Sequence, residues 1–398
     1  MSLNKNKVVI VGGGFGGIKA ALGLIEDQRF DVTLISDSSE LRYYPTLYHS
    51  ATNGLRANSS IPLKVIFTNK NINLVKDTAT GLDRKNKELI TASGKKYPYD
   101  DLILGLGVVT NYFNIPGLDK YSFSIKTQEE AARLKKHFHQ QLTNDHRPDL
   151  NYVIVGAGPT GIELAGVLPS YLKQITKNHH LPPKKIHIDL IEAAPKLLPR
   201  LPKDTSRMIG RQLRRLGVKV YTNSIVQGET ADQLMVNGKP INSHTVIWTA
   251  GVTNNPFFSA NDFSLMNRGK VAVDVYLQAE NNIYVIGDNA NTPYSGLAQT
   301  ALRDGAFVAN NLIRQLDNKR LKSYRPHQPI TIIPAGPHWA AVIKGNIRIY
   351  GRLGWALREA ADLVGFHDLE PWNKATLQWL TEFDEQDDCP VCAINTRQ

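Results

Sequence analysis

The chain has 398 residues, of which 42% are hydrophobic and 21% are charged. This length and composition are typical of a globular protein with two or three domains, and they exclude an intrinsically disordered chain. The formal net charge of +11 favours anionic partners such as nucleotides or acidic lipid headgroups. No nucleic-acid-binding pattern accompanies this charge, so we expect no nucleic-acid partner.

The two cysteines, Cys389 and Cys392, both lie close to the C-terminus. They exclude a disulfide framework inside the folded body, which fits a reducing cytoplasm. A single CxxC pair is half a zinc site at most, so we expect no bound metal.

The N-terminal segment begins with a β-branched strand over residues 7–11, followed by a helical pattern over 16–27 and a second strand over 31–35. The apolar run from 8 to 25 resembles a signal peptide or a membrane span in hydropathy alone. Its glycines cluster where the strand meets the helix, however. We therefore interpret the run as a strand–helix corner, with no cleaved signal and no transmembrane helix.

The same strand–helix–strand order returns further along the chain, with a strand over 151–155, a helix from about 161 and a strand over 186–191. Each repeat has the pattern of a β-α-β unit with fully buried parallel strands. This duplication predicts an α/β fold with two Rossmann-like dinucleotide-binding domains.

A G-x-G-x-x-G pattern joins strand to helix in both repeats, through Gly12, Gly14 and Gly17 and through Gly156, Gly158 and Gly161. The first glycine of such a pattern permits a tight turn, the second lets a pyrophosphate approach the backbone, and the third packs helix on strand. The helix N-terminus then faces the phosphates. One copy is weak support for nucleotide binding, but two copies in two β-α-β units favour it.

Polar residues follow the strands that lead into these sites. Glu192 stands where an acid binds the adenosine ribose, which favours NADH over NADPH because a 2′-phosphate would be repelled. In the first repeat the corresponding residues are Ser36 and Asp37, and the pattern does not choose between them. Asp288 ends an apolar strand over 282–288, and we expect the returning chain to bring it to the first ligand.

The remaining elements define the domain boundaries. Apolar strands over 97–107 and 245–251 both end in glycine, and a helical pattern covers 299–316. We predict a first nucleotide domain in two parts, 1–112 and 248–325, a second nucleotide domain over 113–247, and a C-terminal module over 326–398.

In this order the motifs resemble those of the flavin reductases with two dinucleotide folds. Segments 159–163, 248–252 and 298–301 look most like type II NADH dehydrogenase, the single-subunit NADH:quinone oxidoreductase. The resemblance spans nearly the whole chain. It implies that the first domain binds FAD and the second binds NADH, and that a hydride passes from NADH to FAD before two electrons reach a quinone.

The resemblance also assigns individual residues. It implies catalytic positions at Glu163, near the nicotinamide and flavin, and at Gln299, beneath the flavin. The residues assigned to FAD are Gly12, Gly14, Phe15, Gly16, Gly17, Ser36, Asp37, Ala79, Gly107, Gly287, Asp288 and Gln299. Those assigned to NADH are Gly156, Gly158, Pro159, Thr160, Gly161, Glu163, Glu192 and Gly251. Those assigned to the quinone are Ala298, Gln299 and Arg303.

Two features bear on the electron acceptor. Arg303 stands where the family's Ala-Gln-x-Ala-x-Gln pattern has glutamine, although arginine can still donate hydrogen bonds to a carbonyl oxygen. Sulfide:quinone and disulfide reductases carry redox cysteines beside the flavin, and residues 1–388 contain none. The alternatives that stay open are a soluble NADH:acceptor reductase of the ferredoxin or rubredoxin type, and an NADH-sensing flavoprotein.

The C-terminal module contains two stretches with apolar residues at helical spacing. These residues are Leu353, Leu357, Ala360, Leu363 and Val364, then Trp372, Thr376, Trp379, Leu380 and Phe383. Lys344, Arg348, Arg352 and Arg358 surround the first stretch, and tryptophan suits the headgroup level of a bilayer. We expect this module to dock on a lipid surface, on the cytoplasmic face of the cell membrane. The alternatives are packing on the flavin domain or a homodimer contact, and the acidic run 382–388 opposes docking.

Overall fold

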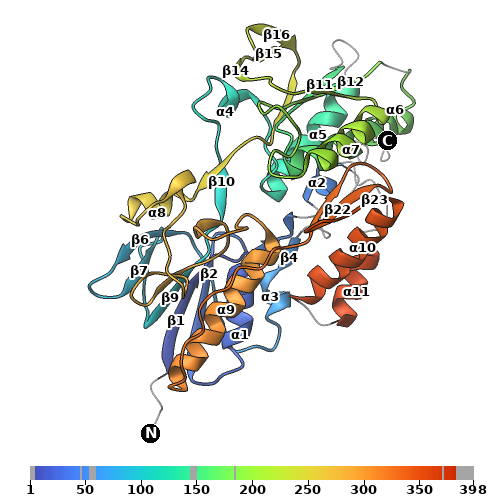
Figure 1. Cartoon of the computed structure of the whole chain (residues 1–398). Coiled ribbons are helices and arrows are strands. Elements are labelled where there is room, and N and C mark those ends of the chain that lie inside the picture. Colours follow the sequence, from blue (N-terminus) through green and yellow to red (C-terminus); the bar gives the residue numbers. More distant parts are fainter. Residues whose placement is uncertain are drawn as a thin grey trace, which may run out of the picture. The chain divides into compact units, whose positions relative to one another are not determined.

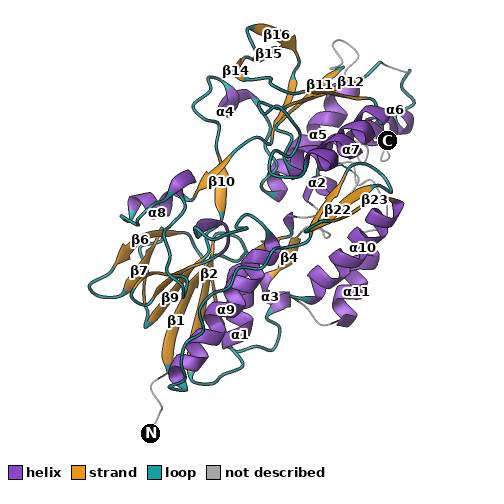
Figure 2. Ribbon diagram, viewed as in Figure 1, coloured by secondary structure: helices purple, strands orange, loops and turns teal. Residues whose placement is uncertain are grey.

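The computed structural model describes residues 5–44, 47–52, 60–143, 150–182, 185–369 and 372–381. The chain forms two compact units, each built from several chain segments. The first unit contains Met1–Leu41, Ile61–Val109 and Val252–Pro329. The second contains Arg42–Ser60, Thr110–Gly251 and Ile330–Gln398. Each unit combines helices with a parallel sheet, which confirms the predicted α/β class (Figures 1 and 2).

A six-stranded sheet organises the first unit. Its strands, in spatial order, are β19 (Gln278–Glu280), β20 (Ile283–Val285), β9 (Asp101–Leu104), β1 (Asn6–Val11), β2 (Phe30–Ser36) and β5 (Asn73–Lys76). All neighbours are parallel except β19 and β20. β-Branched and leucine side chains such as Val9 and Leu102 are fully buried on this sheet, as a sheet covered on both faces requires.

Two helices of the first unit cross through glycine contacts. They are α1 (Phe15–Leu24), drawn blue in Figure 1, and α9 (Ala298–Leu316), drawn orange beside it. A Cβ on Gly305 would lie 2.1 Å from the carbonyl oxygen of Gly16, so only glycine permits this close approach. The contact holds the N-terminal half of α9 against the helix that follows the first glycine loop.

The smaller elements of the first unit lie around this sheet. They are the antiparallel strands β6 (Ala79–Asp83), β7 (Glu88–Thr91) and β8 (Lys96–Pro98), helices α3 (Leu63–Ile66) and α8 (Pro256–Ala260), and the 3₁₀ turns η3 (Asn267–Gly269) and η4 (Gly287–Asn289). Strands β10 (Val108–Thr110) and β18 (Val252–Asn254) pair where the chain passes from one unit to the other, and β3 (Glu40–Arg42) pairs with β4 (Ser60–Pro62).

A four-stranded parallel sheet organises the second unit. Its spatial order is β13 (Val218–Tyr221), β12 (His187–Ile191), β11 (Asn151–Val155) and β17 (Thr245–Trp248). Its helices are α2 (Leu47–Ser50), α4 (Leu118–Tyr121), α5 (Gln128–Thr143), α6 (Pro159–Asn178) and α7 (Lys203–Arg215). An antiparallel meander is formed by β14 (Val226–Glu229), β15 (Gln233–Val236) and β16 (Lys239–Asn242).

The C-terminal segment packs within this second unit. It consists of an antiparallel sheet, β21 (Thr331–Pro334), β22 (Ala340–Lys344) and β23 (Ile347–Gly351), followed by α10 (Arg352–His367) and α11 (Trp372–Thr381). A Cβ on Gly166 of α6 would lie 2.3 Å from the backbone nitrogen of Gly336, so this sheet meets α6 backbone to backbone. Residues 42–60, which the sequence analysis counted with the first nucleotide domain, also contribute to this unit. The assignment of cofactors to the units stays a prediction.

Some predicted elements differ from those observed. The strand expected over 97–107 is divided in two, since β8 ends at Pro98 and β9 covers only Asp101–Leu104. Gly107, whose φ of 73° lies in the left-handed region, stands in the loop after β9. The strand expected over 282–288 ends at Val285, and Asp288 lies in the turn η4. Phe383, the acidic run and both cysteines lie outside the described residues.

Candidate functional site

The first glycine loop connects β1 to α1 at the carboxyl edge of the sheet. Gly12 has a φ of 112°, and its Cβ would lie 2.1 Å from the carbonyl oxygen of Gly105. A Cβ on Gly17 would lie 2.0 Å from the carbonyl oxygen of Gly12. Both positions therefore require glycine, for the turn and for helix–strand packing respectively.

Gly14 differs from its neighbours because a Cβ there would meet no atom within 4 Å. It is the N-cap of α1 and has extended backbone angles that any residue can adopt. Open space next to a helix N-terminus suits a phosphate, because the helix dipole and the first amides favour an anion. The loop thus fits the diphosphate of a dinucleotide.

The predicted ribose residues of the first unit differ in burial. The Ser36 side chain is 5% exposed, and its hydroxyl accepts a hydrogen bond from the Ser38 backbone N–H at 3.2 Å. A Cβ on Gly13 would lie 2.7 Å from the Ser36 hydroxyl, so Ser36 lies directly under the glycine loop. Asp37 is exposed, and Ala79 is buried at the start of β6.

Asp288 lies between two buried residues, Gly287 and Asn289. The Asn289 amide bonds both backbone groups of Gly107: its Oδ1 accepts from the Gly107 N–H at 2.9 Å, and its Nδ2 donates to the Gly107 carbonyl at 2.7 Å. The structure therefore joins Gly107 and Asp288, two predicted FAD residues, through a side chain that sequence reasoning missed. The only sequence signal for it is its place next to Asp288.

The predicted quinone residues lie at the start of α9. Gln299 and Arg303 are both exposed and, four residues apart, they share one helix face. Ala298 is the first residue of the helix. This face can offer an amide and a guanidinium to a carbonyl oxygen.

The second glycine loop repeats the geometry of the first between β11 and α6. Gly156 has a φ of 103°, and a Cβ on Gly161 would lie 1.9 Å from the Gly156 carbonyl oxygen. Gly158 again faces open space, with no atom within 4 Å of its ideal Cβ position. Pro159 follows at the first turn of α6, where its missing N–H costs no hydrogen bond, and Thr160 is half-buried beside it.

Glu192 belongs to this second loop by direct hydrogen bonds. Its carboxylate accepts from the Ala157 backbone N–H at 2.7 Å and from the Ala194 backbone N–H at 2.9 Å. The acid is thus held beside the glycine loop, where a ribose hydroxyl or a 2′-phosphate would approach. Gly251 lies three residues after the end of β17, and a Cβ there would meet the Phe113 ring at 2.4 Å.

Glu163 lies on the first turns of α6, close to buried charge. Burial raises the pKa of its carboxyl to about 7, and the positive charge of Arg358 partly opposes that rise. Burial and the same arginine lower the pKa of His49, on α2, to about 3. A group with a pKa near 7 can gain or lose a proton at neutral pH, which suits a catalytic acid or base.

Arg358 corrects one expectation. It was predicted to surround the apolar stripe as a headgroup contact, but it is 7% exposed and forms an ion pair with Asp362 of the same helix. Gly354, Arg358, Asp362 and Phe366 form the inward face of α10. The four-residue spacing of Arg358 and Asp362 was visible in the sequence, but a helical pattern read from apolar residues alone assigns them to the solvent side.

Residues 6–305 of the chain match the pyridine nucleotide-disulphide oxidoreductase family. The chain belongs to this family. In this pyridine nucleotide-disulphide oxidoreductase, residues 1–388 contain no cysteine. A dithiol relay within that part of the chain is therefore excluded.

Several known proteins are similar to this oxidoreductase. The type II NADH:quinone oxidoreductase of Staphylococcus aureus is 27% identical over 362 residues, which cover 85% of this chain and 89% of the relative. The solved structure of NDH2 from Plasmodium falciparum in complex with NADH superposes with a TM-score of 0.84 at 20% identity and covers 96% of this chain and 98% of that one. The sulfide:quinone oxidoreductase of Aquifex aeolicus gives a TM-score of 0.77 at 21% identity and covers 89% of both chains. These two structures share the fold.

Among the described residues, no group of three or more histidine, cysteine, aspartate or glutamate side chains is placed to hold a metal ion. No helix in the described ranges is both long and apolar enough to cross a membrane.

Proposed function

We propose that this chain is an FAD-dependent NADH:quinone oxidoreductase that works at a membrane surface. The observation that carries the proposal is the pair of glycine loops with open second glycines, one in each unit, together with the absence of cysteine from residues 1–388. The relative from Staphylococcus aureus, named for this activity, supports the acceptor class.

The cofactors divide between the units. We assign FAD to the loop at Gly12–Gly17, with Ser36 or Asp37 at the ribose and Asp288 at the ribityl chain, and NADH to the loop at Gly156–Gly161. FAD, when bound, accepts a hydride from NADH and passes two electrons on to an acceptor. Reduction of a quinone to a quinol would consume that hydride and one proton.

The residues of the chain bind, orient and supply the proton. Glu163 holds a carboxyl with a pKa of about 7, so it can exchange the proton that quinol formation needs. Gln299 and Arg303, on the exposed face of α9, present donors for the quinone carbonyl oxygens. A bulky replacement of Gln299 is then expected to slow reoxidation by quinone and to spare reduction by NADH.

The membrane surface is assigned to α10 and α11. The inward face of α10 contains Gly354, the ion pair of Arg358 and Asp362, and Phe366, whereas its outward side carries Leu353, 63% exposed, and Val364, 52% exposed. Leu377 of α11 is 67% exposed. A helix that exposes apolar side chains and buries an ion pair is stabilised by contact with an apolar partner. The boundary of the lipid acyl chains provides such a partner.

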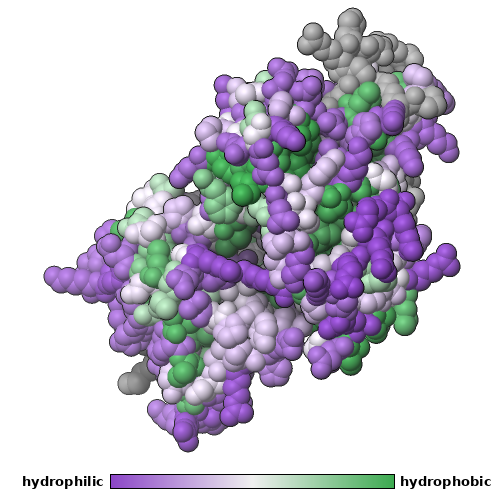
Figure 3. Space-filling view, turned by 45° about the horizontal axis from the view of Figure 1, so that its top comes forward, coloured by the Kyte–Doolittle hydropathy of each residue, from purple (hydrophilic) through white to green (hydrophobic). Residues whose placement is uncertain are grey.

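Charge around these helices supports an acidic leaflet on the cytoplasmic side. Lys344 and Arg352 are exposed, and Arg348 is exposed but paired with Asp204. Each unpaired cation near an anionic surface adds on the order of 1 kcal/mol, and less at high salt. Green hydrophobic areas interrupt the purple hydrophilic surface in Figure 3, as is normal for a globular protein. Exposed apolar area alone therefore does not support docking. The proposal depends on α10, which buries an ion pair and exposes apolar side chains.

The decisive experiment separates the two half-reactions. The purified protein is expected to contain one non-covalent FAD per chain and to be bleached by NADH under anaerobic conditions. Ubiquinone and menaquinone analogues are then expected to restore the oxidised spectrum in a stopped-flow instrument. Rapid reoxidation by ferredoxin or rubredoxin and not by any quinone would replace the proposal with a soluble reductase.

A further inference from the structure

Asp304 lies on α9 beyond the predicted quinone residues, and it has no role in the function proposed above. Its side chain is fully buried. One carboxylate oxygen accepts a hydrogen bond from the Gly287 backbone N–H at 2.9 Å, and the other accepts one from the Tyr324 hydroxyl at 2.6 Å. Asp304 therefore connects α9, the turn η4 and the segment after α9, all within the first unit.

The bond to Gly287 holds the backbone immediately before Asp288. Gly287 has a φ of 65°, so this turn needs a left-handed residue and an external acceptor for its N–H. On the other side of Asp288, Asn289 bonds Gly107, and its Nδ2 also donates to the Asn254 carbonyl oxygen Oδ1 at 2.6 Å. Asp288 is thus the half-buried residue of a turn whose two flanking residues are both buried and hydrogen-bonded.

Charged groups face Asp304 from several elements. Asp288 of η4 and the half-buried Lys270, whose ammonium bonds the Ser295 hydroxyl, both act on it electrostatically. Burial is the main cause that raises the pKa of Asp304 to about 6, and the bond from Tyr324 opposes it. Arg303 acts on Tyr324 in turn. The carboxyl is therefore ionised at neutral pH and becomes protonated in mild acid.

We propose that Asp304 and Tyr324 form a positioning pair that holds η4 so that Asp288 meets the ribityl chain of FAD. The inference rests on the proposed occupation of the first unit by FAD, and not on a quinone as acceptor. Neither residue touches the cofactor in this assignment. Each acts through the backbone of Gly287, and loss of either one loosens a turn that has to be rigid when FAD binds.

A purely structural role, as a brace between α9 and η4, makes a different prediction. A brace affects the free energy of unfolding alone, whereas a positioning pair also affects how fast the intact holoenzyme releases FAD. The rate of FAD release, followed by the rise of free-flavin fluorescence on dilution, separates these roles and needs no turnover.

The test uses the purified holoenzyme with Tyr324→Phe and Asp304→Asn. Tyr324→Phe removes one hydrogen bond to a charged group, so we expect FAD release to be about five- to tenfold faster at pH 7.5. Asp304→Asn keeps the shape and removes the charge, and we expect at least the same acceleration, about tenfold. Tyr324 is half-buried rather than core, so its variant keeps the test valid if Asp304→Asn fails to fold.

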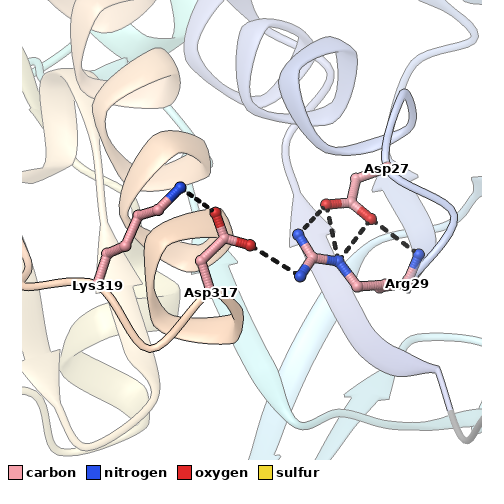
Figure 4. A network of polar contacts seen from close by, with 4 residues as sticks. All are labelled: Asp27, Arg29, Asp317 and Lys319. Carbon is pink, nitrogen blue, oxygen red and sulfur yellow. Dashed lines mark hydrogen bonds and ion pairs between the residues drawn. The ribbon is translucent and has the colours of Figure 1, made fainter.

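Two matched controls lie in the same unit. Asp317→Asn changes another aspartate of α9, at its C-cap, where Arg29 and Lys319 donate to it at 2.8 and 2.9 Å (Figure 4). Tyr97→Phe changes a half-buried tyrosine of β8. We expect FAD release within about twofold of the parent in both, because exposed ion pairs contribute little and neither residue bonds η4.

The pH profile gives the second measurement. FAD release from the parent is expected to accelerate several-fold as pH falls through about 6, where Asp304 becomes protonated. This acceleration is expected to disappear in Asp304→Asn. Equal release rates in the parent and in both variants, or an unchanged pH profile, would overturn the positioning role. A parent protein that binds no FAD would instead overturn the proposed function.

Discussion

The two glycine loops have nearly the same local geometry, yet the chain completes them differently. In the first unit, the residues around Gly107 are bonded to Asn289, 182 positions later, and the turn with Asp288 is held by Asp304. In the second unit, Glu192 follows its loop by 35 positions and bonds Ala157 directly. The first loop is thus completed by a segment that follows the whole second repeat in the chain. The second loop is completed by nearer residues, namely Glu192 and Thr249, whose hydroxyl donates to the Gly156 carbonyl at 2.9 Å. This difference suits a resident cofactor in the first site and an exchanging one in the second.

The strongest test of which loop binds which cofactor is to obstruct one loop at a time. Gly14→Asp and Gly158→Asp each place a carboxylate in open space beside the expected diphosphate, so the fold is preserved. Coulomb repulsion at that distance is expected to weaken the affected cofactor by at least about a hundredfold. Gly14→Asp is expected to yield colourless protein. Gly158→Asp is expected to stay yellow with a greatly raised KM for NADH. A yellow Gly14→Asp protein and a colourless Gly158→Asp protein would show that the two cofactors are assigned to the wrong units.

The second-largest effect is expected on binding to lipid vesicles. Leu353→Glu together with Leu377→Glu removes two exposed leucines from α10 and α11, and should weaken binding to anionic vesicles by about a hundredfold. Met266→Glu with Val275→Glu changes two comparably exposed residues of the first unit and is the matched control. Co-sedimentation measures both. If the leucine variant still sediments with vesicles but is a monomer where the parent is a dimer, the surface is a contact between two copies of the chain.

Glu163 is expected to give an intermediate effect. Its pKa rises from 4.5 to about 7 on folding, so the folded state binds more protons between these values and loses stability as pH rises through them. Glu163→Gln should abolish that loss in urea unfolding at pH 5 and pH 8. It should also slow quinone turnover about tenfold at pH 7. Glu359→Gln, near the same arginine, should leave turnover unchanged. If Glu163→Gln turned over as fast as the parent, the proposal that Glu163 exchanges a proton during quinone reduction would be wrong.

The smallest change is expected at Glu192. Glu192→Gln removes the charge that repels a 2′-phosphate and leaves one side-chain oxygen to accept from the two backbone N–H groups, so the preference for NADH over NADPH should fall about fivefold. Asp189→Asn, in strand β12 just before Glu192, is the control. Steady-state kcat/KM for both cofactors measures the ratio. A parent enzyme that uses NADPH as well as NADH would show that Glu192 does not select the cofactor.

The repeated elements were predictable because their rules are local. Buried parallel strands such as β11 have a continuous run of β-branched residues, and Gly12 and Gly156 stand at turns that only glycine permits. The roles of the predicted site residues stay predictions. Asn289, His49 and Asp304 were not predicted, since nothing in their immediate sequence indicates a partner far along the chain.

By itself, the sequence determined the α/β class, the two loops and the residues at their turns, because strand burial and left-handed backbone angles depend on adjacent residues. Only the tertiary structure decided which polar residues are buried and what they bond. Arg358 was expected to contact lipid headgroups, but it is buried on the inward face of α10. Asp304 accepts a hydrogen bond from Gly287, 17 positions earlier in the chain. Such contacts depend on how helices pack on a sheet, and that packing is set by the whole unit rather than by any single segment.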